Sequence, residues 1–345
     1  GGRGFYFDLA ISSDGRQLAA SSDEGVKLWD LSSRQLQRVL TGHRGESRNV
    51  VFNPDGLHLI SAGIDSSLRV WNLKNGKETF VLRGHTGILL GLDVSPDGQR
   101  LVSCGDDGTI KVWDLTLHPE HAAVNVSGLS GRSSDLACTE AVAFSADGKS
   151  VVAVRRGFGG ASGIATTFDS HGFTLAGKSR IAVTGQWLTP AEPLSLDAAG
   201  RLVAGISLED RRIVRVWEAQ SGKELVTYSG HATPLWHVTL SPDGKWLATA
   251  GWDRSDGQSK GEVRIWDTAS GNLLFERAEP GLRVTRLAFS SSQDRPLLAM
   301  ASLTASQTQD AAAAEPESAV QLFEVPGGKK IKSLSGHGDF IAGLN

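Results

Sequence analysis

Residues 84–114 place short apolar runs between turn sequences, and this pattern predicts three β-strands. The apolar runs are ILLGLDV, RLVSCG and IKVWD, and the turn sequences SPDG and DDGT separate them. Residues 42–72 carry the same text in GHRGESRNVVFNPDGLHLISAGIDSSLRVWN, with Trp71 placed 42 residues before Trp113. Self-similarity at this period predicts a chain of repeated all-β units.

The repeated units begin with Gly-His, as at Gly42 and Gly84, and end with Trp-Asp or a close variant, as at Trp113. In these residues the chain resembles the WD40 family, and the resemblance covers nearly all of the sequence. It implies an all-β fold: a seven-bladed WD40 β-propeller with four-stranded antiparallel blades around a central channel. Closure of such a ring removes most exposed sheet edges.

The repeats predict that residues 1–335 form one seven-bladed propeller. The expected blades are about 1–41, 42–83, 84–127, 128–184, 185–229, 230–278 and 279–335. Residues 336–345, GHGDFIAGLN, match the start of an eighth repeat, although FYFDLAIS already supplies the first strand of blade 1. Three interpretations stay open: a link to a missing C-terminal region, a segment that displaces the N-terminal strand, or an eight-bladed ring. We expect the propeller to be a module of a longer chain.

Composition narrows the function classes. A net charge of −3 gives no argument for a nucleic-acid or membrane-surface partner. Cys104 and Cys138 form neither a metal-type spacing nor a disulfide framework. No apolar run approaches the ~18 residues that span a membrane, and no signal peptide is visible. We therefore expect a monomeric, cytoplasmic domain with no cofactor and no metal, and neither HPEH (118–121) nor GFGG (157–160) changes this.

The resemblance also implies a hydrogen-bonded chain of His, Ser or Thr, Asp and Trp within a blade. Carried over by position, the members are His43, Ser61, Asp65 and Trp71 in blade 2, His85, Ser103, Asp107 and Trp113 in blade 3, and His231, Thr249 and Trp266 in blade 6. In blade 6 an inserted loop is expected to displace Asp253 from the place of the acid. Blade 1 has Ala20 in the hydroxyl position, and blades 4, 5 and 7 lack most of the set. Since the same set recurs in separate blades, we interpret it as scaffolding and not as a Ser-His-Asp catalytic site.

Aligned starts of the first strands predict a ring of side chains at the top of the channel. The ring comprises Phe7, Arg48, Leu90, Glu140, Glu192, Trp236 and Thr285, and Phe5, Glu46, Ile88 and Arg283 lie two residues before four of its members. Aromatic residues with Arg are typical of protein-binding hot spots. The alternative is a packed plug in the mouth of the channel.

The lengths of the loops also favour the top face as the binding surface. Long segments are expected at 127–140, 155–163, 207–212, 253–262 and 303–318, and binding is often carried by variable loops on a rigid scaffold. Drift in tolerant loops is the alternative. The sequence thus predicts a non-enzymatic scaffold that binds a protein or peptide on its top face, formed by the Gly-His loops and the second-to-third-strand loops. The alternatives are an enzyme whose acid/base site in the channel uses Glu46, Glu140 and Glu192, and a domain that only spaces or dimerises its parent chain.

Overall fold

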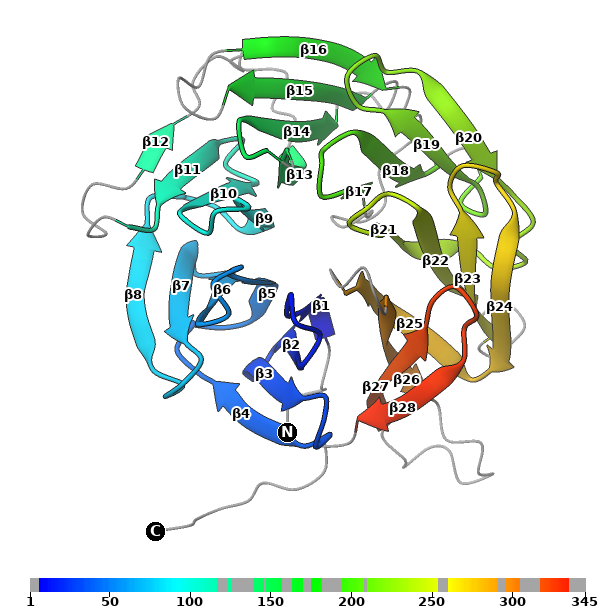
Figure 1. Ribbon diagram of the computed structural model, residues 1–345, viewed down its shortest axis with the longest axis horizontal. Coiled ribbons are helices and arrows are strands. Elements are labelled where there is room, and N and C mark those ends of the chain that lie inside the picture. Colours follow the sequence, from blue (N-terminus) through cyan, green and yellow to red (C-terminus); the bar gives the residue numbers. More distant parts are fainter. Residues whose placement is uncertain are drawn as a thin grey trace.

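A ring of β-sheets forms the structure, which is a computed structural model (Figure 1). It describes residues 6–116, 123–125, 139–145, 147–156, 163–169, 175–181, 194–207, 210–253, 260–290, 296–304 and 317–334. The described strands form seven four-stranded sheets, here called blades 1 to 7 in chain order. All neighbouring strands within a blade are antiparallel. The all-β propeller predicted from the repeats is therefore confirmed.

The blades have the following strands. Blade 1 has β1 (Tyr6–Ile11), β2 (Gln17–Ser22), β3 (Gly25–Asp30) and β4 (Leu36–Leu40); blade 2 has β5 (Ser47–Phe52), β6 (His58–Gly63), β7 (Ser67–Asn72) and β8 (Glu78–Arg83); blade 3 has β9 (Leu89–Val94), β10 (Arg100–Gly105), β11 (Ile110–Asp114) and β12 (Ala123–Asn125). Blade 4 has β13 (Thr139–Phe144), β14 (Ser150–Arg156), β15 (Gly163–Asp169) and β16 (Leu175–Ile181); blade 5 has β17 (Leu194–Leu196), β18 (Leu202–Ile206), β19 (Val214–Glu218) and β20 (Glu224–Tyr228). Blade 6 has β21 (Leu235–Leu240), β22 (Trp246–Asp253), β23 (Lys260–Asp267) and β24 (Leu273–Pro280); blade 7 has β25 (Leu282–Phe289), β26 (Leu297–Thr304), β27 (Glu317–Glu324) and β28 (Lys330–Leu334).

The turn between the first two strands of a blade is held by its own side chains. In the SPDG turn of blade 3, the Ser95 hydroxyl donates to Asp97 and accepts from the Arg100 N–H at 2.9 Å. Gly98 takes a φ of 72°, and a Cβ there would lie 2.5 Å from the Asn53 side-chain oxygen of blade 2. Glycine is therefore required both for the backbone conformation and for the close approach of the neighbouring blade.

Neighbouring blades are joined by apolar side chains. The closing contact between blades 1 and 7 contains Leu9, Trp29, Ala301 and Leu322 among its buried members. Arg286 of β25 adds a hydrogen bond to the backbone carbonyl of Phe7 in β1. Each blade is one continuous stretch of chain, so no described strand is shared between the first and last blades, and side-chain packing closes the ring.

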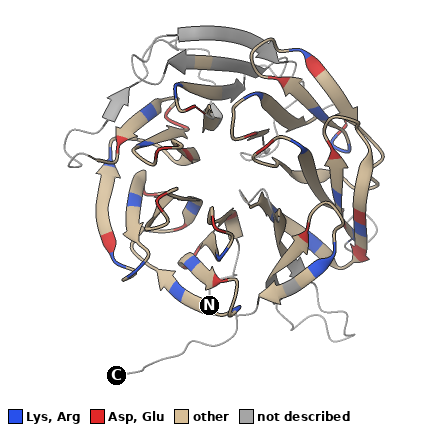
Figure 2. Ribbon diagram, in the orientation of Figure 1, with Lys and Arg blue, Asp and Glu red and all other residues tan. Residues whose placement is uncertain are grey.

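The sequence left open which segment supplies the first strand of blade 1, and in the structure that strand is β1. Residues 336–345 lie outside the described part of the chain, as do Cys138 and the HPEH segment. Acidic and basic side chains of the described residues are mixed around the ring, with no sector of one sign (Figure 2). Among the described residues, no helix is long and apolar enough to cross a membrane.

We predict that the contact between blades 1 and 7 supports the whole ring. Leu9→Ala removes a side chain that is 5% exposed in this contact and should lower the free energy of unfolding by about 2–5 kcal/mol. Leu57→Ala, at a site 58% exposed, should change it by less than about 0.5 kcal/mol. Urea unfolding followed by tryptophan fluorescence measures both, and equal effects would show that the contact between blades 1 and 7 is not stabilising.

Candidate functional site

The first strand of a blade starts with a β-bulge at the same position in six blades. The register shifts at Phe7, Arg48, Leu90, Glu140, Trp236 and Thr285. These are six of the seven residues that the alignment of strand starts had placed in one ring, and we call them the bulge ring. A bulge leaves one residue unpaired and re-aims its side chain. Glu192, the seventh residue, and Phe5 lie outside the described residues.

Two kinds of loop meet beside the bulge ring. In blade 2 the Ile64 N–H, in the turn between the second and third strands, donates to the Glu46 carbonyl at 3.1 Å. In blade 3 the Asp106 N–H donates to the Ile88 carbonyl at 2.9 Å. The segment before the first strand and the second-to-third-strand turn therefore share one face of the disc, here called the top face.

In blade 2 the four residues of the expected chain are hydrogen-bonded in order. Trp71 Nε1 donates to Ser61 Oγ at 2.8 Å, and Ser61 Oγ lies 2.8 Å from His43 Nε2. His43 Nδ1 lies 3.0 Å from Asp65, which also accepts the Arg44 N–H. The tautomer with a proton on Nδ1 satisfies every donor, because Ser61 then donates to Nε2. The arrangement links the third strand, which carries the Trp, to the loop on the top face.

Blade 3 repeats this geometry. Trp113 Nε1 donates to Ser103 Oγ at 2.8 Å, and His85 lies 2.8 Å from both Ser103 and Asp107. Burial lowers the pKa of His85 although Asp107 works against this. Burial alone would raise the pKa of Asp107, but hydrogen bonds from Thr109 and the Thr86 N–H hold it at about 2. A neutral His beside an ionised Asp stays a hydrogen-bonding unit at neutral pH, since neither group changes its charge there.

In blade 6 the acid is Glu262, which occupies the place from which the sequence analysis considered Asp253 displaced. Trp266 Nε1 donates to Thr249 at 2.9 Å, and Thr249 lies 2.8 Å from His231 Nε2. His231 Nδ1 is 3.0 Å from Glu262, which also accepts the Thr233 N–H at 2.7 Å. The contacts with His231 and Thr233 outweigh burial and lower the pKa of Glu262 to about 2.

Glu262 had a sequence signal that the search for an aspartate missed. It lies four residues before its Trp, the position held by Ser67 in blade 2 and Thr109 in blade 3, both of which donate to the turn Asp. The longer Glu side chain reaches the imidazole from this strand position, whereas the shorter Asp must sit in the turn. A Glu at this position therefore substitutes for the turn Asp.

The remaining blades have no hydroxyl at the corresponding register position. That position, two residues beyond the one paired with the Trp or Phe, holds Ala20, Ala153, Gly205 and Met300. In blade 5 the Trp217 Nε1 atom has no hydrogen-bond partner among the described residues. The sequence predicted that these blades lack members of the His, Ser or Thr, Asp and Trp set, and the strand register agrees with that prediction.

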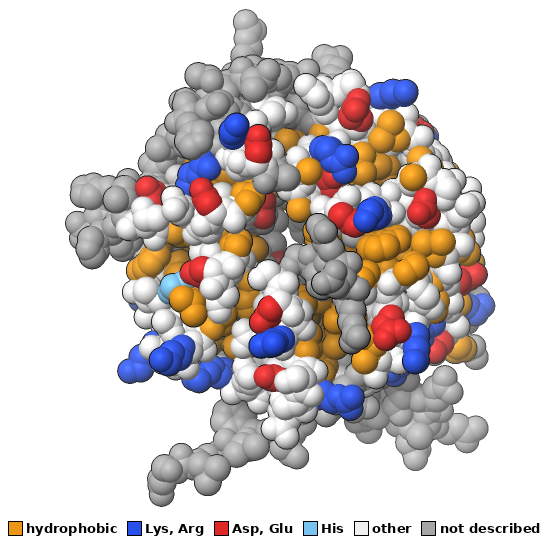
Figure 3. All heavy atoms as spheres, in the orientation of Figure 1, with side chains coloured by type: hydrophobic (Ala, Val, Ile, Leu, Met, Phe, Trp, Pro, Cys, Tyr) orange, Lys and Arg blue, Asp and Glu red, His pale blue; other side chains and the backbone are white. Residues whose placement is uncertain are grey.

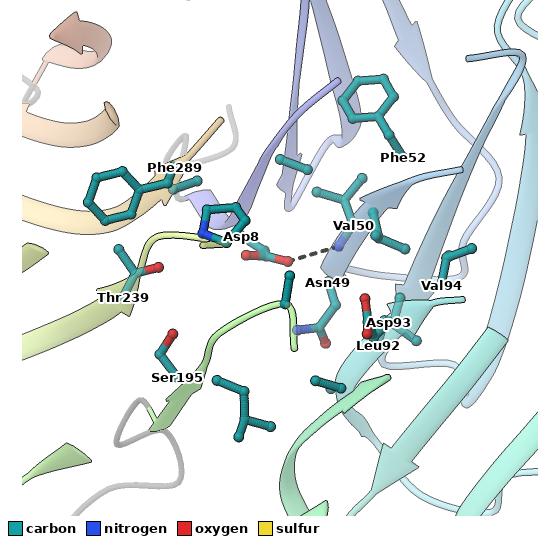
Figure 4. A pocket seen from close by; sticks show the side chains of 18 of the residues that line it. Asp8, Asn49, Val50, Phe52, Leu92, Asp93, Val94, Ser195, Thr239 and Phe289 are labelled. Atoms are coloured by element: carbon teal, nitrogen blue, oxygen red, sulfur yellow. Dashed lines mark hydrogen bonds between the residues drawn. The ribbon is translucent and has the colours of Figure 1, made fainter. Parts of the chain in front are cut away.

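A central hollow runs along the first strands of the blades. Its volume is about 620 Å³, and the mouth is visible at the centre of the disc in Figure 3. In Figure 4 the Asp8 carboxyl group points into the channel, with Asn49 and Asp93 on one side of it and Ser195 and Thr239 on the other. Asp8 accepts the Val50 N–H at 3.0 Å, Asp93 accepts the Phe144 N–H at 2.6 Å, and Ser195 accepts the Leu240 N–H at 2.9 Å. Each of these bonds joins two adjacent blades.

The channel carboxyl groups are poorly solvated. Burial raises the pKa of Asp8 to about 6, although the Val50 N–H and Arg286 counteract it. Burial likewise raises the pKa of Asp93 to about 7 and lowers the pKa of His237 well below its usual range. Desolvation also lowers the pKa of the Arg286 guanidinium. These residues lie between blades and support the ring from inside.

Four side chains from blades 5, 6 and 7 stack on the top face. The Trp236 and Trp252 rings are stacked at 5.3 Å with 19° between their planes. The Arg211 guanidinium lies 4.4 Å from the Trp236 ring centroid, and the Arg283 guanidinium lies 4.1 Å from that of Trp252. Trp236 Nε1 donates to the Trp252 carbonyl at 3.0 Å. We call these four residues the Trp–Arg stack; the sequence analysis had selected Trp236 and Arg283 but neither Arg211 nor Trp252.

Three other predicted rim residues, Phe7, Glu46 and Arg48, are in contact through Arg48. Arg48 lies 4.5 Å from the Phe7 ring centroid and forms an ion pair with Glu46 at 3.0 Å. Of the three glutamates considered for acid/base chemistry, only Glu46 has a described side chain, and its carboxylate is held by this guanidinium. The described residues contain no group of three or more His, Cys, Asp or Glu side chains placed to hold a metal ion.

Comparison with known proteins finds matches to the repeats. The family model "WD domain, G-beta repeat" matches residues 5–30, 34–72, 76–114 and 222–256. The crystal structure of the Myceliophteria thermophila Cps50 (Swd1) β-propeller domain superimposes with a TM-score of 0.69, at 19% identity, over 86% of this chain and 93% of that chain. The chain contains WD40 repeats and has the fold of a β-propeller. The network residues of blades 2 and 3, and His231 and Thr249 of blade 6, thus lie in the matched repeats.

Curated relatives match this WD40 propeller over part of its length. The mouse Periodic tryptophan protein 2 homolog is 29% identical over 144 residues, 41% of this chain and 14% of that protein. Superkiller complex protein 8 of Dictyostelium discoideum is 37% identical over 59 residues, 16% of this chain and 20% of that protein. Subunit I of eukaryotic translation initiation factor 3 from Emericella nidulans is 35% identical over 68 residues, 20% of this chain and 18% of that protein. The matched segments therefore span at most a fifth of these three relatives.

We predict that Glu262 stabilises blade 6 as the acid partner of His231. Glu262→Gln removes the charge that lies 3.0 Å from His231 Nδ1 and accepts the Thr233 N–H, and should cost about 1–3 kcal/mol of unfolding free energy. Glu276→Gln is the matched control. Arg264 lies 3.5 Å from Glu262 and 2.7 Å from Glu276, but the Glu276 side chain is 44% exposed, and a surface ion pair is worth about 0–1 kcal/mol. Thermal unfolding of the two variants measures the difference, and equal losses would remove Glu262 from this role.

We predict that Asp93 makes the WD40 propeller less stable as the pH rises. The carboxyl pKa is raised from 3.8 to about 7 on folding, so the folded state binds the proton more tightly. The stability from this proton is present at acidic pH and is lost as pH rises through about 7. Asp93→Asn should therefore reduce the fall in unfolding free energy between pH 5 and 8 by roughly 1–3 kcal/mol.

The control for this pH measurement is Asp97→Asn in the turn of the same blade. Hydrogen bonds from Ser95 and Gln99 lower the pKa of Asp97, so its titration lies below the tested range. A pH profile of Asp93→Asn that matches the native profile between pH 5 and 8 would contradict the assignment.

Proposed function

We propose that this WD40 propeller is a non-enzymatic scaffold that holds a protein or peptide partner on its top face. The observation that carries the proposal is the bulge ring, which occurs at one register position in six blades. It gathers Phe7, Arg48 and Trp236 on one rim, and aromatic and Arg side chains dominate binding energy at protein interfaces. The rim is supported by a closed ring of packed blades, which gives a rigid surface at low entropic cost to a partner.

Relatives support a role in protein assemblies. Superkiller complex protein 8 and subunit I of eukaryotic translation initiation factor 3 are named as components of multi-protein assemblies. We infer the same general role for this chain, with a protein partner and without a nucleic-acid or membrane partner. The domain would act as a monomeric unit of a larger cytoplasmic protein.

The test is capture of partners by the intact domain and by a rim variant. Phe7→Ala combined with Trp236→Ala should reduce recovery of specific partners by at least tenfold, because two anchors of the rim are lost. Leu57→Ala combined with Leu225→Ala is the control, since both leucines are exposed and neither belongs to the bulge ring.

The outcome depends on which double variant loses partners. Equal recovery by the native domain and the rim variant would reject the top face as the binding face. Loss in the leucine variant alone would place the interface elsewhere on the propeller. A second double variant, Phe7→Leu with Trp236→Phe, keeps apolar side chains at both positions. If its melting temperature matches that of the native domain, any loss of partners is a loss of binding and not of folding.

A further inference from the structure

One register position of the first strands lines the central hollow with mostly small side chains. In each blade the residue at this position pairs with the second-strand residue that directly precedes the hydroxyl position, as Asp93 pairs with Val102 before Ser103. We call the set the Asp93 layer; its polar members are Asp93, Ser195 and Thr239, and its apolar members are Ala10, Val51, Ala143 and Ala288. The hollow has a volume of about 620 Å³, which is the size of a pocket for a small ligand.

The charge on the wall of the hollow is negative. Among the described residues that line it, the charged side chains are Asp8, Asp93 and Asp197, and none is a Lys or Arg. Two of these acids have a cation beside them from outside the lining. The Arg286 charge acts on Asp8, and Arg201 lies 3.2 Å from Asp197.

Asp93 is the acid of this wall without a cationic partner among the described residues. It accepts the Phe144 N–H at 2.6 Å, and its second donor is the Val94 N–H, so both donors are neutral backbone groups. His237 also lines the hollow but adds no positive charge at neutral pH, because burial and the Arg286 charge lower its pKa well below the usual range. The Asp93 side chain is half-buried and lines the hollow (Figure 4). A poorly solvated carboxylate without a cation is complementary to a cationic ligand.

We propose that the channel binds a small primary aliphatic amine, with its ammonium group on the Asp93 carboxylate and its methylene groups along the apolar members of the Asp93 layer. This site is separate from the top-face function and needs no protein partner. An ammonium group supplies a positive charge together with N–H donors, which form strong hydrogen bonds to a carboxylate. The Ala and Val side chains of the layer favour methylene groups in the rest of the ligand.

The depth of Asp93 favours a free amine over a lysine side chain of a protein partner. Leu90 belongs to the bulge ring on the top face, and Asp93 lies three residues further along β9, about 10 Å away along the strand. The stem of a lysine side chain has four carbons and spans only about 6 Å. Beyond Asp93 the lining continues to Pro54, Pro96 and Pro242, in the turns at the opposite end of the channel.

The experiment is a titration of the protein with n-butylamine, followed by NMR of carbon-13-labelled alanine methyl groups at constant ionic strength. n-Butanol has a similar chain without the charge, and n-butyltrimethylammonium has the charge without N–H donors. We expect n-butylamine to shift the Ala10 and Ala143 methyl signals in a saturable way. It should bind at least tenfold more tightly than either of these compounds or than potassium ion.

Binding should strengthen as the pH rises through the range in which Asp93 loses its proton. Burial raises the pKa of Asp93 to about 7, so the affinity should increase roughly tenfold between pH 6 and 8. The ligand stays charged in this range, because aliphatic ammonium groups titrate near about 10.4. Asp8 has a pKa of about 6 and titrates partly in the same range, so the difference between the native protein and Asp93→Asn isolates the contribution of Asp93.

Two variants test the position of the site. Asp93→Asn keeps the shape of the side chain but removes its charge, and should weaken n-butylamine binding at least tenfold. Ala143→Leu leaves Asp93 intact and fills the hollow beside it, so it should weaken binding by a similar factor even if Asp93→Asn is poorly folded. Asp97→Asn is the control, because Asp97 is an exposed acid in the turn of the same blade and lies outside the lining; it should leave the affinity unchanged.

Several outcomes would overturn the proposal. These are absent binding of n-butylamine, equal binding of n-butanol or n-butyltrimethylammonium, and native affinity in both Asp93→Asn and Ala143→Leu. Potassium ion bound more tightly than n-butylamine would replace the amine by a metal cation and overturn it as well. The Phe7→Ala and Trp236→Ala double variant should keep its affinity for n-butylamine, so failure of the amine site and failure of the top-face function are distinguishable.

Discussion

Side-chain packing between blades is the interaction on which the whole propeller depends. Each sheet is made from one continuous stretch of chain, and backbone hydrogen-bond ladders run only within sheets. The contact between blade 1 and blade 7 is therefore of the same kind as the others, with Leu9, Trp29 and Leu322 in its core. The channel groups reinforce this arrangement: the Asp8 and Asp93 carboxyl groups each accept a backbone N–H from the following blade.

Within the blades, rigidity is distributed unevenly. Blades 2, 3 and 6 carry a chain of contacts from indole to hydroxyl to imidazole to carboxylate, and in blades 2 and 3 every step of it is a hydrogen bond. A fully satisfied buried polar network specifies one packing more sharply than apolar contacts alone. Blade 5 buries Trp217 without that chain. The Trp–Arg stack joins blade 6, which has a complete set, to blades 5 and 7, which do not.

The sequence was sufficient for the fold and for most of the bulge ring. Periodicity and the Gly-His and Trp-Asp pairs locate the blades because the turns and strands recur at fixed offsets. The ring could be aligned because each bulge falls at the same distance from its repeat signals, as Arg48 and Leu90 illustrate. Glu262 was missed because its role depends on side-chain reach and not on a turn motif. Arg211 and Trp252 were missed because they meet across blades, and one-dimensional alignment contains no such contact.

The contact between blades 1 and 7 has a consequence for the order in which the protein folds. Contacts within a blade join residues close in sequence, whereas the bond from Arg286 to Phe7 spans 279 residues. Loop-closure entropy makes such distant contacts slow to form relative to local hairpins. During synthesis, blades 1 to 6 can each form as they emerge, but the apolar flank of blade 1 stays uncovered until β25 to β28 have been made. That flank is then the surface most in need of protection by a chaperone while the chain is still on the ribosome.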